Sequence, residues 1–413
     1  TARVAREFVV ALLLLAPVVW LAWLQVDPAR AGPIAIAVLV VSCPCALSLA
    51  TPAALAAASG AALRQGMLVA SGDLLLRAAE TTDVVFDKTG TLTAGRPELV
   101  GLIVLPGAGD RLGAGTTEAG LLAIAAALET GQPHPMAEAI RRAAAGSPWP
   151  AATESRTWPG LGVQARVDDR SWRLGNASFA GPAPKASPPG GAPDSADPAD
   201  AADPARAGDP GDTVIWLADE AGPVAQLRLR DALRPETPEV VARLAARGLR
   251  LHLLSGDEAG TVATVARQLG IAAHRGGARP DDKLNYVRAL QREGRTVLMV
   301  GDGINDAPVL AAADVSVAVG EATSLARTAA GVVLLGRRIS DLCRLHELAQ
   351  DTRRIVKQNL GWAMVYNALA IPAAAVGWVP PAVAAIGMSA SSLLVAVNAL
   401  RLMPRQRRPN GGR

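Results

Sequence analysis

The chain has 413 residues, of which 50% are hydrophobic and 19% are charged, and its formal net charge at pH 7 is +4. Globular proteins average about 25% charged residues, so this composition excludes a disordered chain and favours membrane-embedded segments. So small a net charge gives no support for a nucleic-acid partner. Three cysteines, two of them one residue apart, cannot build a disulfide framework, and we expect reduced thiols.

Three stretches of the chain lack charged side chains, namely 8–26, 31–63 and 358–400, the last interrupted by a turn rich in glycine and proline. A membrane-spanning helix needs about 20 apolar residues. The sequence therefore predicts four transmembrane helices, in two hairpins surrounded by membrane lipid. Arginine and lysine flank the outer ends of these hairpins, whereas the turns inside them hold only Asp27 and Arg30. The positive-inside rule then places both termini and the intervening block in the cytoplasm.

In the block between the hairpins, short apolar runs rich in β-branched residues alternate with segments of helical period. The expected strands cover 84–86, 249–254, 296–300 and 315–319, and the expected helices cover 239–247, 258–269 and 281–293. This alternation is typical of a doubly wound parallel sheet. Residues 181–212 differ, because they hold eight prolines, six aspartates and almost no large apolar side chain. We expect them to form a disordered insertion in a smaller domain, 96–230.

Acidic side chains follow three of the expected strands. Val84–Phe86 leads into Asp87-Lys88-Thr89-Gly90-Thr91-Leu92-Thr93, and the later strands lead into Ser255-Gly256-Asp257 and Gly301-Asp302-Gly303-Ile304-Asn305-Asp306. Ligands of an open parallel sheet bind beyond the carboxyl ends of its strands. The pattern therefore predicts a magnesium-phosphate site, with Lys283 available to neutralise phosphoryl charge. For Ser255–Asp257 alone, ordinary turn residues would be the better interpretation.

The run from Asp87 to Thr93, followed in order by the run from Gly301 to Asp306, resembles the phosphorylation and hinge sequences of P-type ATPases. The resemblance covers nearly the whole chain. It implies an α-helical membrane domain plus a haloacid-dehalogenase-like α/β phosphorylation domain with an inserted α+β nucleotide-binding domain. The expected domains are a membrane hairpin, 1–70; the phosphorylation domain, 71–95 and 231–345; the nucleotide-binding domain, 96–230; a second membrane hairpin, 346–403; and a basic tail, 404–413.

The resemblance also implies a mechanism and a set of catalytic residues. Asp87 would attack the γ-phosphate of ATP to form an aspartyl phosphate, a known use of a carboxylate nucleophile. Mg²⁺ would be held by Asp87, the backbone carbonyl of Thr89 and Asp302. The other expected catalytic residues are Lys88, Ser255 (where many relatives have threonine), Asp257, Lys283, Asn305 and Asp306.

Six residues of the smaller domain match the nucleotide-binding positions of the heavy-metal-transporting branch: Glu129, His134, Gly160, Gly162, Gly175 and Asn176. Each alone is an ordinary turn residue, and the inference depends on their order after the phosphorylation motif. Glycines would let adenine and ribose approach the backbone closely. His134 would stack on the base or hydrogen-bond to it.

Cys43-Pro44-Cys45 lies within the second predicted span. Buried cysteines are often only small apolar residues, but Pro44 disrupts the helix, which in a membrane is tolerated mainly beside protein or a cavity. Thiolates select soft ions such as Cu(I). The spacing i, i+2 suits ligation better than a disulfide, so we expect a pair of thiol ligands.

The later spans carry Tyr366-Asn367, Met388 and Ser391-Ser392, which together resemble the copper(I) branch of this family. The zinc and cadmium branch carries an intramembrane aspartate, whereas residues 358–400 hold no acidic side chain. The resemblance implies copper ligation by Cys43, Cys45 and Met388, supported by Tyr366, Asn367 and Ser392. It also implies copper(I) donor and acceptor proteins as partners. The residues around these motifs are more similar to the subgroup that supplies copper for cytochrome oxidase assembly than to detoxifying exporters.

The leading hypothesis is an ATP-driven exporter of copper(I). Relatives also carry an actuator domain with a Thr-Gly-Glu loop, which this sequence lacks, so we expect a pump that begins partway along its length. The alternative is a membrane-tethered phosphohydrolase of the haloacid-dehalogenase type that uses Asp87 but transports nothing. The intramembrane ligand set argues against that alternative.

Overall fold

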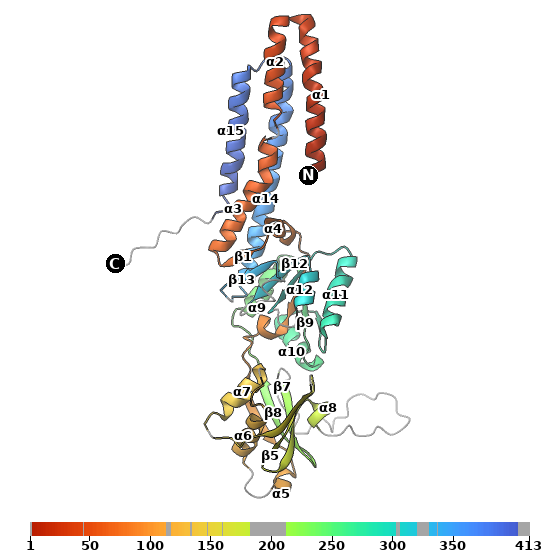
Figure 1. The fold of residues 1–413 in the computed structure, drawn as a ribbon, viewed down its shortest axis with the longest axis vertical. Coiled ribbons are helices and arrows are strands. Elements are labelled where there is room, and N and C mark those ends of the chain that lie inside the picture. Colours follow the sequence, from red (N-terminus) through yellow and green to blue (C-terminus); the bar gives the residue numbers. More distant parts are fainter. Residues whose placement is uncertain are drawn as a thin grey trace, which may run out of the picture. The chain divides into compact units, whose positions relative to one another are not determined.

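The computed structural model describes residues 2–43, 45–112, 117–132, 134–146, 148–158, 160–181, 212–302, 306–319, 330–336 and 338–403, with side chains from residue 14 onward. The expected basic tail lies outside these ranges. Figure 1 shows the helices and strands of the chain, coloured from the N-terminus to the C-terminus. The chain divides into two compact units. The first holds residues 1–82, 290–298 and 313–413, and the second holds 83–289 and 299–312.

The first unit contains the apolar helices. They are α1 (Ala2–Val26), α2 (Pro28–Val41), α3 (Cys45–Arg64), α14 (Asp341–Ala375) and α15 (Pro381–Leu400). Asp27 begins α2 as its N-cap, because its carboxylate accepts a hydrogen bond from the backbone N–H of Ala29 at 3.1 Å. Within the described residues, two segments are long and apolar enough to cross a bilayer, Pro28–Arg64 and Pro381–Leu400. The four spans and their orientation stay a prediction.

Small residues line the contacts between these helices. Ala46, Ala50, Ala363 and Val395 form one buried cluster, in which α3, α14 and α15 meet. Small side chains let helix backbones approach closely, as helix packing in lipid requires. Large apolar side chains such as those of Leu14, Leu369 and Ile386 are instead exposed, and a membrane would cover them.

A buried amide fastens three of these helices together. The Asn359 side chain of α14 donates to the carbonyl oxygens of Ala50 on α3 at 3.4 Å and Val395 on α15 at 3.3 Å. Its own oxygen accepts from Asn398 at 2.9 Å. The polar side chain is therefore fully partnered, which is the condition for burying it.

The α/β part is built on a seven-stranded sheet with the order β1-β13-β12-β11-β2-β9-β10. Its strands are β1 (Met67–Val69), β2 (Asp83–Asp87), β9 (Arg250–Leu254), β10 (Ala273–Arg275), β11 (Val297–Gly301), β12 (Val315–Val319) and β13 (Val332–Leu334). β2 pairs with β9 in parallel, from Asp83 opposite Arg250 to Asp87 opposite Leu254. Among the described pairings of this sheet, only that of the short strand β1 with β13 is antiparallel. The predicted parallel α/β class is confirmed.

Helices connect these strands, as the sequence predicts. They are α4 (Gly72–Ala78), α9 (Thr237–Ala246), α10 (Ala259–Leu269), α11 (Pro280–Arg292) and α12 (Ala307–Ala312). All five residues of β2 are buried, as are those of β11 and β12. Continuous burial is expected of parallel strands covered on both faces.

The second unit also carries a six-stranded antiparallel sheet with the order β3-β8-β7-β6-β5-β4. The strands are β3 (Glu98–Val104), β4 (Thr153–Trp158), β5 (Gly162–Val167), β6 (Arg170–Gly175), β7 (Thr213–Asp219) and β8 (Gly222–Arg230). Helices α5 (Ala108–Leu112), α6 (Glu118–Leu128), α7 (Pro135–Ala144) and α8 (Ala177–Ala180) accompany them. The core beneath α6 and α7 includes Leu121, Ile140, Trp172 and Leu217.

The predicted insertion, 181–212, is described only at its two ends. Gly181 closes α8, and the buried Asp212 carboxylate accepts hydrogen bonds from Arg230 at 2.6 and 3.0 Å. The prediction of disorder is therefore wrong for Asp212, because this bidentate ion pair fixes the start of β7 against the end of β8. Residues 182–211 lie outside the described residues.

Candidate active site

Asp87 is the last residue of β2, and its carboxyl group is buried at the carboxyl end of the parallel sheet. The chain then turns sharply through Lys88–Leu92 (η1), where Gly90 has φ +71°. A Cβ atom at Gly90 would lie 2.8 Å from the Asp302 Oδ2 atom. Glycine is therefore needed for two reasons, namely the left-handed backbone and the close approach of Asp302.

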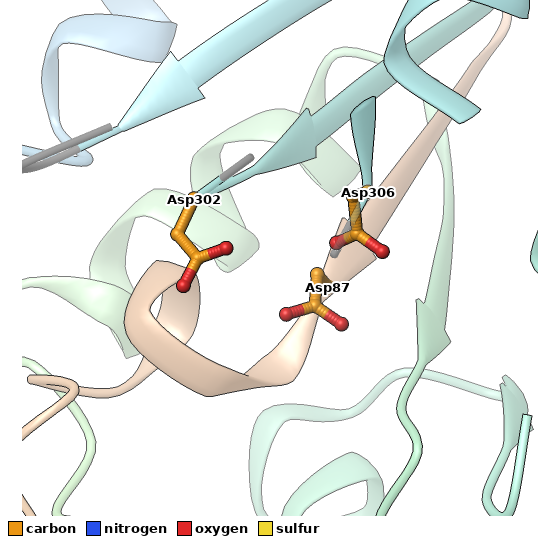
Figure 2. Close-up of side chains that lie close together, drawn as sticks. All are labelled: Asp87, Asp302 and Asp306. Carbon is orange, nitrogen blue, oxygen red and sulfur yellow. The ribbon is translucent and has the colours of Figure 1, made fainter. Parts of the chain in front are cut away.

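Three carboxylates meet at the carboxyl end of the parallel sheet, those of Asp87, Asp302 and Asp306 (Figure 2). One carboxylate oxygen from each of Asp87, Asp302 and Asp306 lies within 4.8 Å of the others. Lys283, on α11, donates hydrogen bonds to Asp87 Oδ1 at 2.6 Å and to Asp306 Oδ1 at 2.8 Å. The structure thus brings together residues from three separate segments of the chain, at Asp87, at Lys283 and at Asp302 and Asp306.

Burial and the neighbouring charges shift the pKa values of the groups in this cluster. Burial raises the pKa of Asp87 to about 7, and the nearby Asp306 adds to the rise, whereas Lys283 opposes it. Burial lowers the pKa of Lys283, but Asp87 and Asp306 outweigh that effect and raise it above its ordinary value. Three carboxylates against one ammonium leave negative charge in excess. Hard oxygen ligands in this arrangement fit Mg²⁺.

Lys88 does not join this cluster. Its buried ammonium forms an ion pair with Asp257, the carboxylate that follows β9. The backbone N–H of Asp257 in turn donates to the buried Ser255 Oγ at 3.1 Å. These three predicted residues therefore connect the turn after β2 to the turn after β9. Thr89 is exposed, and Asn305 lies outside the described residues.

Two residues without a sequence signal hold the turn after Asp87 in place. The Thr93 hydroxyl donates to Asp231 Oδ2 at 2.6 Å, and the N–H of Gly90 donates to the same hydroxyl at 3.0 Å. Arg234 donates to the carbonyl oxygens of Gly90 at 2.9 Å and Thr91 at 3.0 Å. Asp231 and Arg234 belong to no motif, so only the fold identifies them.

A cavity of about 790 Å³ opens beside the antiparallel sheet. All six residues predicted to bind nucleotide line it: Glu129, His134, Gly160, Gly162, Gly175 and Asn176. Trp158, Thr213, Gly256 and Glu258 also line it, and none of these four is among the residues predicted to bind nucleotide. The volume is within the usual range for small-molecule sites.

Two facing glycines shape the wall of this cavity. Gly162 on β5 pairs with Gly175 on β6, and a Cβ atom on either would lie 2.2 Å from a backbone oxygen of the other strand's segment. Asn176 donates from its side chain to the carbonyl oxygen of Gly160 at 3.0 Å. The same residue caps α8 by accepting from the N–H of Phe179 at 3.1 Å. These hydrogen bonds hold the backbone around Gly160 and Asn176 in place beside the two glycines.

The titratable groups of the cavity are desolvated. Burial raises the pKa of Glu129 to about 7, despite the opposing charge of Arg141, and burial lowers the pKa of His134. His134 begins α7, and its Nδ1 accepts the N–H of Met136 at 3.2 Å. Nδ1 is therefore the unprotonated nitrogen, which leaves Nε2 as the side that can meet a ligand.

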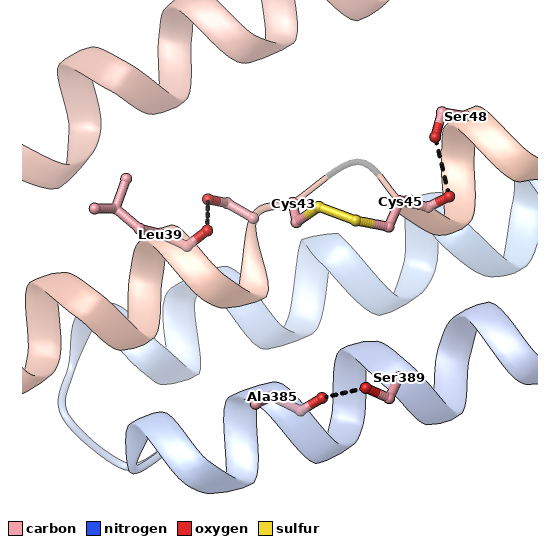
Figure 3. The surroundings of a disulfide bond; sticks show 7 residues. Leu39, Cys43, Cys45, Ser48, Ala385 and Ser389 are labelled. Atoms are coloured by element: carbon pink, nitrogen blue, oxygen red, sulfur yellow. Dashed lines mark hydrogen bonds between the residues drawn. A yellow bond between two sulfur atoms is a disulfide. The ribbon is translucent and has the colours of Figure 1, made fainter.

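Cys43 and Cys45 are joined by a disulfide at the break between α2 and α3 (Figure 3). The expectation of two reduced thiols is wrong for this structure. The i, i+2 spacing itself places the two Cα atoms 5.4 Å apart, within the range that a disulfide spans. Cys343 is buried on α14 and forms no disulfide.

The other predicted copper-site residues lie on α14 and α15. A Cβ atom on Gly387 would be 2.9 Å from the Tyr366 hydroxyl, so Tyr366 of α14 lies against the residue that precedes Met388 on α15. Asn367 is buried, and Ser392 is half-buried. The copper ligand set stays a prediction.

Comparison with known proteins places this geometry in context. Residues 84–314 match the haloacid dehalogenase-like hydrolases. A copper-exporting P-type ATPase of Mycobacterium tuberculosis is 38% identical over 413 residues, covering 99% of this chain and 51% of that protein. The probable copper-exporting P-type ATPase V of the same species is 36% identical, covering 97% of this chain and 50% of its own length.

A solved structure is also similar to this chain in fold and sequence. The crystal structure of a zinc-transporting PIB-type ATPase in its E2.Pi state superposes with a TM-score of 0.74 at 30% identity, over 97% of this chain and 63% of that one. The chain spans about half the length of the curated relatives it matches. The resemblance to metal-transporting P-type ATPases is confirmed, and the chain belongs to the haloacid dehalogenase-like hydrolase family.

Proposed function

We propose that this chain takes part in ATP-driven export of copper(I) from the cytoplasm, through an aspartyl phosphate formed on Asp87. The observation that carries the proposal is the buried meeting of Asp87 with Lys283, Asp302 and Asp306. A carboxylate that only stabilised the fold would not need two further carboxylates within 4.8 Å.

In the proposed step, a carboxylate oxygen of Asp87 forms a bond to the γ-phosphorus of ATP while the bond to the β,γ-bridging oxygen breaks and ADP leaves. The carboxylate must be ionised to attack, and a pKa near 7 keeps a substantial ionised fraction at neutral pH. Lys283 holds Asp87 in place and would attract the incoming phosphoryl group. Asp87 and Asp302 would hold Mg²⁺, which supplies positive charge against the phosphoryl oxygens.

The 790 Å³ cavity is the proposed site for the nucleotide. Gly162 and Gly175 have no side chain, so a flat base and its ribose could approach the backbone of the cavity wall closely. Glu129, with its pKa near 7, is partly protonated at neutral pH and can donate a hydrogen bond to a base nitrogen. His134 Nε2 would offer the second polar contact.

For the transported ion, we propose copper(I) bound by Cys43 and Cys45 after a cellular thiol reduces their disulfide, with Met388 as a third sulfur ligand. Tyr366, Asn367 and Ser392 would support this site. The names of the two mycobacterial relatives support copper, and the absence of acidic residues from 358 to 400 favours it over zinc. Membrane lipid and copper(I) donor and acceptor proteins are the proposed partners, and oxidase assembly is the proposed use.

Phosphorylation with radiolabelled ATP and Mg²⁺ tests the proposal, with and without Cu(I), in the presence of a reducing thiol. We expect an acid-stable, hydroxylamine-sensitive phosphoprotein that Asp87→Asn abolishes. Its amount should depend on Cu(I) in the unmodified chain and in Cys343→Ala, but not in Cys43→Ala. Labelling that ignores both Cu(I) and Cys43 would indicate a membrane-tethered phosphohydrolase, and labelling that responds to Zn²⁺ alone would reject copper. The absence of any label would reject the proposal.

A further inference from the structure

A second buried polar cluster lies at the opposite end of β2 from Asp87. Asp83, the first residue of that strand, is fully buried and accepts hydrogen bonds from Arg250 at 2.8 and 3.0 Å. Its Oδ1 also lies 2.9 Å from His252 Nε2. The other ring nitrogen of His252, Nδ1, lies 2.9 Å from the Tyr286 hydroxyl. Neither the motifs nor the proposed reaction uses these residues.

The cluster connects β2 and β9 to α11. Residues 83, 85 and 87 share one face of β2 because side chains alternate along a strand. In the sheet register, His252 stands opposite Val85. Tyr286 is three residues after Lys283 on α11, about one helical turn away. Helix α11 is therefore tied to β2 twice, once through Lys283 at Asp87 and once through Tyr286 and His252 at Asp83.

Both ring nitrogens of His252 have a hydrogen-bond partner, Asp83 at Nε2 and the Tyr286 hydroxyl at Nδ1. Because each contact occupies a specific donor or acceptor, this hydrogen-bond chain fixes the rotation of α11 about its own axis as well as its distance from the sheet. A purely apolar contact at Tyr286 would not fix that rotation.

We propose that Tyr286, His252 and Asp83 are positioning residues that hold α11 so that Lys283 reaches Asp87. The proposal rests on the function proposed above, because it assigns these residues to the formation of the aspartyl phosphate. They touch neither ATP nor the reacting atoms. Their loss should therefore lower the rate of phosphorylation and leave the KM for ATP unchanged, since the nucleotide cavity lies on other elements.

Two pairs of variants of the full chain test the proposal. Tyr286→Phe removes only the hydroxyl, and we expect the phosphorylation rate to fall roughly fivefold to tenfold, the size expected for one hydrogen bond. His252→Asn keeps a polar atom near the Nδ1 position but loses the contact to Asp83, so it should also lower the rate. His252→Gln places its amide near the Nε2 position, loses the contact to Tyr286, and should resemble Tyr286→Phe. In a Lys283→Ala background, Tyr286→Phe should have no further effect, because the two act as one unit.

Hydrogen exchange of α11 gives a measurement that does not depend on phosphorylation. Tyr286→Phe and His252→Gln should speed exchange in residues 280–292 and leave the antiparallel sheet unchanged. Unchanged exchange in α11 would overturn the proposal even if the unmodified chain formed no phosphoprotein, a result that separately rejects the proposed function. The proposal is equally wrong if α11 loosens while phosphorylation stays at the unmodified rate, or if the effects of Tyr286→Phe and Lys283→Ala simply add.

Discussion

Replacing Asp87 by asparagine should stabilise the fold, and the gain should depend on pH. In the folded chain, burial and Asp306 raise the pKa of Asp87 from 3.8 to about 7. An acid whose pKa is raised on folding has its full stabilising effect below its unfolded pKa and loses it as pH rises through the folded value. Asparagine keeps the shape and can still accept from Lys283, but it carries no charge to bury.

The expected size of the effect follows from the same shift. A rise from 3.8 to about 7, at about 1.36 kcal/mol per pKa unit, corresponds to about 4 kcal/mol as an upper bound. The gain of Asp87→Asn over the unmodified chain should therefore be smallest near pH 4, grow between pH 4 and 7, and level off above pH 7. Lys283 keeps Asp306 as a partner in the variant, so no unpaired ammonium offsets the gain.

Urea unfolding of the detergent-purified chain, without Mg²⁺ and at several pH values, measures this difference. Asp281→Asn is the matched control for the substitution itself, because this carboxylate is exposed at the start of the same helix as Lys283. It should not reproduce the gain that Asp87→Asn shows above pH 7. A pH-independent difference for Asp87→Asn, or a variant less stable at pH 8 than the unmodified chain, would refute the reasoning.

Three further predictions concern the metal, the nucleotide and the shape of its cavity. Asp302→Asn should raise the Mg²⁺ concentration needed for half-maximal phosphorylation at least tenfold and leave the KM for ATP unchanged, which a Mg²⁺ titration at saturating ATP would show. The KM for ATP should rise above about pH 7 as Glu129 ionises, and Glu129→Gln should remove that dependence, so a pH series of KM values that is identical in both chains would count against it. Gly175→Ala should abolish binding of a fluorescent ATP analogue because its Cβ would meet a backbone oxygen at 2.2 Å, whereas Gly101→Ala, with open space around it, should bind normally.

Residues in local patterns could be predicted from the sequence. Strand β2 and the acidic turns after three strands follow from motifs in which neighbours along the chain carry the signal, and the six residues that line the cavity follow from their order after the phosphorylation motif. The parallel sheet then brings Asp87 and Asp302 together, because their strands end at one edge, and Asp306 is four residues further along the chain.

Contacts between distant residues without a repeating pattern could not be predicted. Arg234 reaches Gly90 across 144 positions, and Thr93 reaches Asp231 across 138, with no motif at the later partner. The same is true of His252 and Tyr286. The pairing of Lys88 with Asp257 depends on the orientation of a buried side chain, which spacing does not reveal.

The position of the phosphoryl group tests the central claim most directly. Borohydride reduces an aspartyl phosphate to homoserine, so the chain can be incubated with ATP and Mg²⁺, reduced, digested and analysed by mass spectrometry. The account predicts homoserine at position 87 and aspartate at positions 257, 302 and 306. Phosphorylation at another residue, or an unmodified Asp87 in chain that has consumed ATP, would contradict it.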